Sequence, residues 1–378
     1  MVASVAGGVK PASIIDIEQR FYRQLIAGQQ REQGSMPLAA ELEELVFKLE
    51  VEREAAMQRL EKKQQAQALI DNIRNQLVKT LLGELDNHIA MPQLFLKDSA
   101  ISNKQLLLLE LISSSQLDLN RLRPVVADIP WLGRDLITIV NSPAFVAKRP
   151  QGSDIQVNDL KLVLNYIGMD QLRLYIPYYL CRHWLSANPS LVWVNRKVWR
   201  YLQLQAVAAR ALAQLHQQDG ILLYSVALMQ QLGMSLLLGV AANIYERLRH
   251  TWRREAMAQR DGELHDAVSV CQFPLEQLWP IIATHSANLC WQVPSALGFA
   301  DAAPIKLLRE RASSVAFSSL SDTAKILDKS ACYAKCLLLE ELQQLSFSDK
   351  KLLFTYYELS EQEQIRLSGQ NFRKTEPV

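Results

Sequence analysis

Residues 129–145 read IPWLGRDLITIVNSPAF and predict a helix that ends abruptly. Pro143 disfavours helical geometry at the preceding Ser142, so the helix has to stop there. The side chains of Asn141 and Ser142 can satisfy backbone groups that are left over after a helix end, and Phe145 can return to the core. We interpret this turn as a structural joint; the alternative is that Asn141 binds a ligand.

Short helical patterns lie on both sides of this turn. Clusters of turn residues, such as Ser113-Ser114-Ser115 and Asn188-Pro189-Ser190, separate them. The patterns cover residues 103–113, 118–127, 157–168 and 171–185. Short helices joined by loops of a few residues indicate a globular bundle.

The composition favours helices throughout the chain. Among 378 residues there are only 14 Gly and 14 Pro, while Leu, Ala, Gln and Glu are abundant. The hydrophobic fraction of 49% is enough for sizeable cores, and the length suits two or three domains. The sequence therefore predicts an all-α protein.

An uncharged run covers residues 220–245. Its length would suit a membrane helix, but Gln230 and Gln231 lie in its middle. We therefore expect buried core helices that meet near Gly239, and no membrane span.

The N-terminal region, residues 1–92, is expected to be a helical extension. A first helix is predicted from about Asp16 to Gly28. Leucines then recur at helical spacing over residues 38–60 and 69–85, which predicts one long helix or two helices with a break near Gln64. A hairpin folded onto the next domain is favoured over a coiled-coil homodimer through these helices, because the heptad pattern is not sustained.

Five cysteines are present, at positions 181, 271, 290, 332 and 336. An odd number without regular spacing does not indicate a disulfide framework. The N-terminus also lacks the charged and apolar regions of a signal peptide. Both observations favour a cytoplasmic protein with reduced thiols.

Several motifs, taken in order, resemble those of the HDOD family, the HD-related output domains. The turn from Asn141 to Phe145 is similar to the family's [VA]-N-S-P-x-[FY] turn. Further similarities, in register, lie in Val157–Gly168 with Leu172-Arg173, in Val198–Tyr201, in Leu228–Met234 and in the expected turn Trp291–Pro294. The resemblance covers residues 94–320. It implies an N-terminal helical subdomain at 93–190, an HD-like helical bundle at 191–368 and a tail at 369–378.

The same resemblance indicates lost chemistry. HD phosphohydrolases hold divalent metals with His and Asp side chains, and the metal activates water against a phosphoester. Here the family's first His falls on Tyr201, its His-Asp pair on Gln230-Gln231 and its Lys on Met234. A Gln amide is a weak metal ligand. We therefore expect no metal, no cofactor and no catalytic residue: a degenerate HD scaffold that is not an enzyme.

One alternative is a phosphohydrolase whose metal site has been rebuilt elsewhere. His265-Asp266 is a literal His-Asp pair, and His285 lies on a predicted helix. A lone dipeptide in a polar setting is a weak motif, so we interpret it as a surface feature. The alternative depends on these side chains meeting in space.

Charge is nearly balanced, with 41 basic and 39 acidic residues, which argues against a general nucleic-acid binder. A basic, aromatic segment could still bind a nucleotide, another phosphate-bearing ligand or an acidic partner. Its residues are Arg247, Arg249, Trp252, Arg253 and Arg254. A solvated helix face explains the same pattern more simply.

The resemblance to HDOD proteins implies a non-catalytic bacterial signal-transduction module. Without catalytic groups, it would act through contacts with a signalling protein whose identity the sequence does not reveal.

Overall fold

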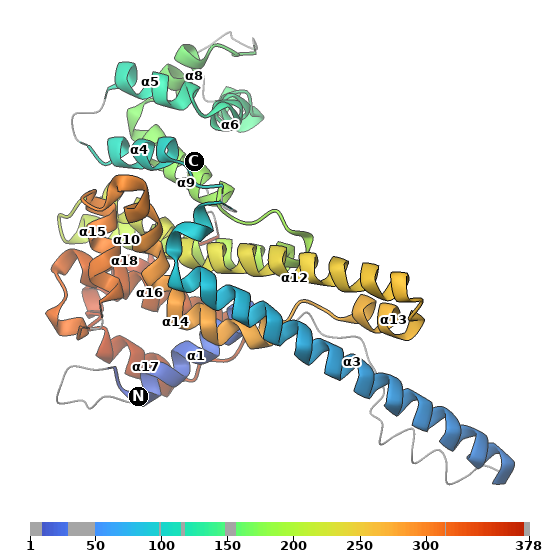
Figure 1. Cartoon of the computed structure of the whole chain (residues 1–378). Helices are drawn as coiled ribbons and strands as arrows, with labels where there is room; N and C mark the ends of the chain where they lie inside the picture. The colour runs from blue at the N-terminus through green and yellow to red at the C-terminus, as the bar shows by residue number, and fades with distance from the viewer. Residues whose placement is uncertain are drawn as a thin grey trace.

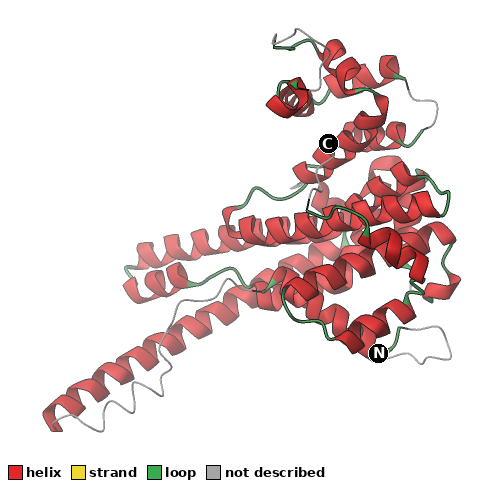
Figure 2. Ribbon diagram, turned by 180° about the vertical axis from the view of Figure 1, so that it is seen from behind, coloured by secondary structure: helices red, strands yellow, loops and turns green. Residues whose placement is uncertain are grey.

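The computed structural model describes residues 10–28, 50–97, 100–114, 118–147, 156–313 and 315–373. Every regular element within these ranges is helical, which confirms the predicted all-α class (Figure 1). Seen from behind, helices make up a small lobe, a larger bundle and two projecting arms (Figure 2).

The small lobe consists of short helices, two of which begin at an aspartate side-chain cap. The carboxylate of Asp118 accepts a hydrogen bond from Arg121 N at 2.8 Å, and that of Asp159 accepts one from Leu162 N at 2.9 Å. Such caps satisfy N–H groups that have no partner inside the helix. The lobe contains α4 (Asn103–Ile112), α5 (Leu119–Ala127), α6 (Pro130–Val140), α7 (Pro143–Val146), α8 (Leu160–Ile167) and α9 (Met169–His183).

The larger bundle is built around α10 (Val192–Leu215), which packs against α11, α16, α18 and α1. The bundle follows the short helix η4 (Pro189–Leu191). Its other helices are α11 (Gly220–Met229), α12 (Leu232–Gln259), α13 (Gly262–Val270), α14 (Leu275–Pro294), α15 (Ala303–Ala312), α16 (Asp322–Glu341), α17 (Phe347–Tyr356) and α18 (Glu361–Ser368), with short helical turns η5 (Ser295–Phe299) and η6 (Phe317–Ser319).

The uncharged run forms α11 and the first half of α12. This stretch is long and apolar enough to cross a membrane, but 89% of its most apolar window is buried inside the protein. It therefore forms core helices of the bundle, as the sequence indicates.

The break in this run was predicted at the wrong residue. Helix α12 continues through Gly239, and the two helices meet at Gln230 and Gln231. The cause lies on α14. The Cys290 thiol donates to Gln230 O at 2.8 Å, and Gly233 N donates to Cys290 Sγ at 3.2 Å. These hydrogen bonds satisfy the carbonyl of Gln230 and the N–H of Gly233 at the junction.

The turn expected at Val293-Pro294 also lies elsewhere. Helix α14 runs through to Pro294. The chain changes direction at Gly298, whose φ of 94° is readily adopted only by glycine.

The N-terminal region contributes two helices that dock at different places. Helix α1 (Ala12–Ile26) packs against α10, α14 and α17. Helix α3 (Glu50–Ala90) is one continuous helix through Gln64, and its C-terminal half packs against α12, α13 and α14. Its N-terminal half projects beyond the bundle (Figure 1). The leucines predicted to lead into α3, at positions 38, 42, 45 and 49, lie outside the described residues.

All five cysteines are buried and none forms a disulfide. Burial raises the thiol pKa of Cys181 and Cys271, and it raises that of Cys290 to about 11. The thiol pKa of Cys332 lies well above its ordinary value, because burial and the neighbouring thiol of Cys336 both disfavour a thiolate. Apart from the hydrogen bonds of Cys290 at the helix junction, we interpret these thiols as small buried side chains rather than reactive ones.

At the C-terminus, α18 is followed by a turn that brings Phe372 against Tyr333, with ring centroids 5.6 Å apart. The tail from residue 374 onward lies outside the described part of the chain.

Candidate functional site

Three of the four positions at which the sequence predicts that the family's His, His-Asp pair and Lys are replaced come together around one cavity. Tyr201 lies on α10, while Gln230 and Gln231 form the junction between α11 and α12. All three line a cavity of about 60 Å³. Met234, the fourth position, is fully buried in α12 and does not line it.

These three side chains present neutral groups to the cavity. Burial raises the pKa of Tyr201, so its phenol keeps its proton. The Oε1 of Gln230 accepts a hydrogen bond from Gln205 Nε2. Phenol and amide oxygens are poor replacements for imidazole nitrogen and carboxylate oxygen. This set of donors does not fit a divalent metal ion.

Two protein cations complete the wall of the cavity. Lys335 comes from α16 and Arg311 from α15. Lys335 Nζ lies 2.5 Å from Glu18 Oε1, and Arg311 Nη2 lies 2.5 Å from Asp328 Oδ1. Burial alone would lower the pKa of Lys335, but the Glu18 carboxylate raises it well above its ordinary value. Both cations stay charged, and their charge opposes binding of a metal cation here.

Glu18 connects α1 to this site. Its carboxylate also accepts hydrogen bonds from Lys10 Nζ at 2.6 Å and from the hydroxyl of Tyr357 at 2.9 Å. Burial would raise the pKa of Glu18, but the ammonium groups of Lys335 and Lys10 outweigh it and hold this pKa far below its ordinary value. The first helix is thus tied to the cavity wall by a carboxylate whose side chain is only 13% exposed.

The close approach of α12 to α14 positions the two glutamines. A Cβ on Gly233 would lie 1.9 Å from the backbone oxygen of Ser286, so only glycine fits between the helices. This close approach explains why position 233, two residues after Gln231, is a glycine.

The residues considered for a rebuilt metal site do not line this cavity. His265 and Asp266 lie on α13, with 3.1 Å between Nδ1 and Oδ1, and the Asp266 side chain is 85% exposed. His285 lies on α14 and is half-buried. Among the described residues, no group of three or more His, Cys, Asp and Glu side chains is arranged to hold a metal ion.

The Asn141 turn joins two segments of the small lobe. Asn141 Nδ2 donates to Ile137 O at 3.0 Å and to Val157 O at 2.9 Å, while its Oδ1 accepts from Val157 N at 2.9 Å. Ser142 precedes α7, Pro143 occupies its first turn, and Phe145 packs against the core. These are the contacts of a structural joint.

Replacing Asn141 with Ala is expected to destabilise the protein by about 2–3 kcal/mol, because it leaves both backbone groups of Val157 without partners. Urea unfolding followed by circular dichroism measures this loss. Asn165→Ala, at an exposed position on α8, is the matched control and should change stability by less than about 0.5 kcal/mol. Equal stability of the two variants would contradict the structural role of Asn141.

The basic segment of α12 divides into two parts. Arg247 forms an ion pair with Glu84 of α3, and Arg249 donates to Ser269 O at 2.9 Å. Trp252 is partly buried against the core. Arg253 and Arg254 are exposed. Two of the four arginines therefore join α12 to its neighbours.

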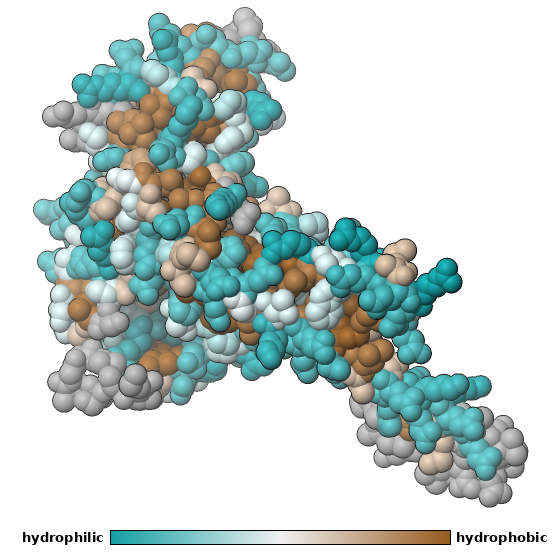
Figure 3. Space-filling view, viewed as in Figure 1, coloured by the Kyte–Doolittle hydropathy of each residue, from teal (hydrophilic) through white to brown (hydrophobic). Residues whose placement is uncertain are grey.

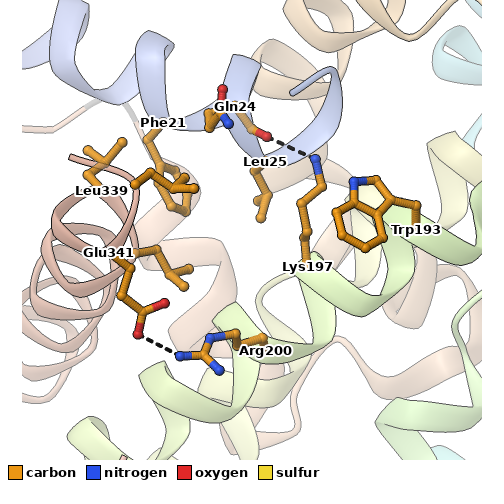
Figure 4. A pocket seen from close by; sticks show the side chains of 10 residues that line it. Phe21, Gln24, Leu25, Trp193, Lys197, Arg200, Leu339 and Glu341 are labelled. Atoms are coloured by element: carbon orange, nitrogen blue, oxygen red, sulfur yellow. Dashed lines mark hydrogen bonds and ion pairs between the residues drawn. The ribbon is translucent and has the colours of Figure 1, made fainter. Parts of the chain in front are cut away.

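A second, larger cavity of about 200 Å³ lies beside α1 (Figure 4). Its walls are mainly apolar and include Phe21, Leu25 and Leu339. Lys197 Nζ donates to the backbone oxygens of Gln24 and Gly28, each at 2.9 Å, and burial lowers its pKa to about 8. Sequence motifs did not indicate this cavity, because its walls come from three helices far apart in the chain.

Sequence reasoning also missed the cations of the first cavity. Lys335 is the only charged residue in the segment SACYAKCLLL, residues 330–339. A lone Lys on an otherwise buried helix face was the available signal, since such a residue needs a counter-charge. Its partner Glu18 is more than 300 positions away, and no local pattern connects the two.

Comparison with known proteins supports the resemblance to HDOD proteins. Residues 100–268 match the family model described as HDOD domain. No match was found among curated proteins or among solved structures. The matched range contains the Asn141 turn, Tyr201 and the two glutamines, whereas Glu18, Arg311 and Lys335 lie outside it. The family inferred from the motifs is thereby confirmed, and residues 100–268 of this chain form an HDOD, or HD-related output, domain.

Proposed function

We propose that this protein is a non-catalytic regulatory module of bacterial signal transduction that acts in the cytoplasm through protein–protein contacts. Its scaffold is HD-related, and the metal-dependent chemistry of HD phosphohydrolases has been replaced by ion pairs and neutral side chains.

The observation that supports this proposal most directly is the cavity at Tyr201. Its neutral phenol and amides cannot supply the anionic and imidazole ligands that activate water on a metal. Lys335 and Arg311 add positive charge at the same place. The neutral ligands and the added positive charge both act against a hydrolytic metal centre.

Contact with a partner is supported by apolar side chains at the surface. Brown, apolar residues reach the surface of the small lobe in Figure 3. On α8, Leu162 is 50% exposed and Tyr166 is 41% exposed, and the two lie one helical turn apart. Exposed apolar side chains that gather on one face are typical of interaction surfaces.

A homodimer through the N-terminal helices is the other kind of contact that the sequence allows. The projecting half of α3 is the surface available for it, and sedimentation at increasing protein concentration would measure association.

Metal content and hydrolysis test the proposal together. The full chain, purified without chelator and then incubated with manganese or iron, is expected to retain far less than one metal ion per chain and to show no phosphodiesterase turnover. Atomic absorption measures the metal, and release of nitrophenol from a nitrophenyl phosphodiester measures the turnover.

The matched control is a double variant, Gln230→Ala with Gln231→Ala, treated identically. Background activity from a contaminating enzyme would be the same in both preparations. Near-stoichiometric metal with turnover that this double variant abolishes would overturn the proposal.

A further inference from the structure

The cavity at Tyr201 contains more hydrogen-bonding groups than the protein itself satisfies. Gln230 is 6% exposed, and its Nε2 has no hydrogen-bond partner. The hydroxyl of Tyr201 and the side-chain amide of Gln231, in residues that are 1% and 5% exposed, also make no hydrogen bond within the described part of the chain. Buried polar groups are nearly always satisfied, so the Nε2 of Gln230 requires water or a ligand.

The two cations of the cavity wall also have N–H groups that their carboxylate partners do not use. An ammonium group has three donors and a guanidinium group has five. Lys335 donates to one carboxylate oxygen of Glu18, and Arg311 uses Nε and Nη2 on Asp328. Donors therefore converge on the cavity from α10, α15, α16 and the α11–α12 junction.

The charged side chains that line the cavity are both cations. Lys335 and Arg311 reach it, whereas their carboxylate partners Glu18 and Asp328 are not among its lining residues. A wall that presents cations and an unpaired donor in a desolvated site favours an anion over water.

We propose that this cavity binds a small oxyanion, such as phosphate or the phosphoryl group of a larger ligand. A volume of about 60 Å³ offers space for about four water-sized groups, at roughly 15 Å³ for each, which suits the oxygens of a tetrahedral oxyanion. The residues that carry the positive charge lie outside the range that matches the HDOD model, so the family match does not account for them. The proposal goes beyond the regulatory function, because oxyanion binding can be measured without any partner protein.

Calorimetric titration of the full chain with inorganic phosphate, at constant ionic strength in chloride and neutral pH, tests this site. We expect one phosphate to bind per chain with a dissociation constant of about 1 mM or tighter. Tyr201→Phe removes only the cavity hydroxyl and should weaken binding about tenfold, since hydrogen bonds to charged groups are strong. Its melting temperature should stay equal or rise, because the lost hydroxyl has no protein partner. Gln231→Leu provides a second, uncharged test of the same wall.

Tyr245→Phe is the matched control. It removes a hydroxyl that donates to Gln272 O at 2.7 Å outside the cavity, so phosphate affinity should be unchanged. Methyl phosphate distinguishes the two sources of the anion: binding of phosphate alone indicates the free ion, and equal binding of both indicates the phosphoryl group of a larger ligand. Absence of saturable heat at ten times the expected dissociation constant, or unchanged affinity in both Tyr201→Phe and Gln231→Leu, would overturn the proposal.

Discussion

Replacing Glu18 with Ala is expected to destabilise the protein by about 3–5 kcal/mol, because it leaves a buried ammonium group without its counter-charge. Lys335 is only 7% exposed, and the Glu18 carboxylate is its ion-pair partner. The same change removes the acceptor for Lys10 and for the hydroxyl of Tyr357. Urea unfolding of the full chain measures the loss.

Two further variants separate the ion pair from general effects on α1. Gln19→Ala changes an exposed residue of the same helix and should be nearly neutral. Glu18→Leu combined with Lys335→Met removes both charges and should recover most of the lost stability, since an apolar pair needs no desolvation of ions. A loss below about 1 kcal/mol in Glu18→Ala would show that Lys335 finds another counter-charge.

The Glu18 carboxylate also makes the stability of the folded protein depend on pH in the acidic range. The pKa of Glu18 lies below its ordinary value of 4.5 in the folded protein. A depressed carboxyl pKa stabilises the folded state fully above the unfolded value, and this contribution falls as the pH drops below it. Glu18→Gln lacks the contribution, so its stability should decline less than that of the original chain between about pH 5 and pH 3.

The second large effect is expected at Gly233. Replacing it with Ala should destabilise the protein by about 3 kcal/mol or more, because the new Cβ would lie 1.9 Å from the backbone oxygen of Ser286. The backbone of Ser286 cannot move out of the way by changing rotamer, as a side chain can. Helices α12 and α14 must therefore separate. Urea unfolding measures the stability, and phosphate titration of the folded fraction reports whether the cavity wall has shifted.

Gly83→Ala is the matched control for the same chemical change. Gly83 lies at an exposed position of α3, where an added Cβ meets nothing within 4 Å. Alanine favours helix more than glycine, so this variant should gain about 0.5–1 kcal/mol. Equal effects of the two substitutions, in sign and size, would contradict the close approach at Gly233.

Local chemistry made much of the fold predictable. Few glycines and prolines indicated an all-α chain, and the helical patterns predicted at 118–127 and 157–168 lie close to α5 and α8. The break at Gly239 was predicted wrongly because a glycine in a helix marks either a bend or a close approach. The observed junction depends on Cys290, some 60 residues further along the chain.

Only part of the cavity could be predicted from the sequence. Tyr201, Gln230 and Gln231 could be found because family motifs fix their order along the chain. Lys335, Arg311 and Glu18 could not, since only folding brings their helices together. The ion pairs at the wall of this cavity are therefore visible only in three dimensions.

The five buried cysteines have a practical consequence for spectroscopy. Thiol-reactive probes attack exposed thiolates, and here the thiols are inaccessible, with burial raising the pKa of Cys181, Cys271, Cys290 and Cys332. The natural chain can therefore serve as the background for single-site labelling. One cysteine introduced at an exposed position, such as Asn165 on α8, would carry a fluorophore while the native thiols stay unmodified. Distances between the small lobe and a labelled partner then become measurable without first removing any native cysteine.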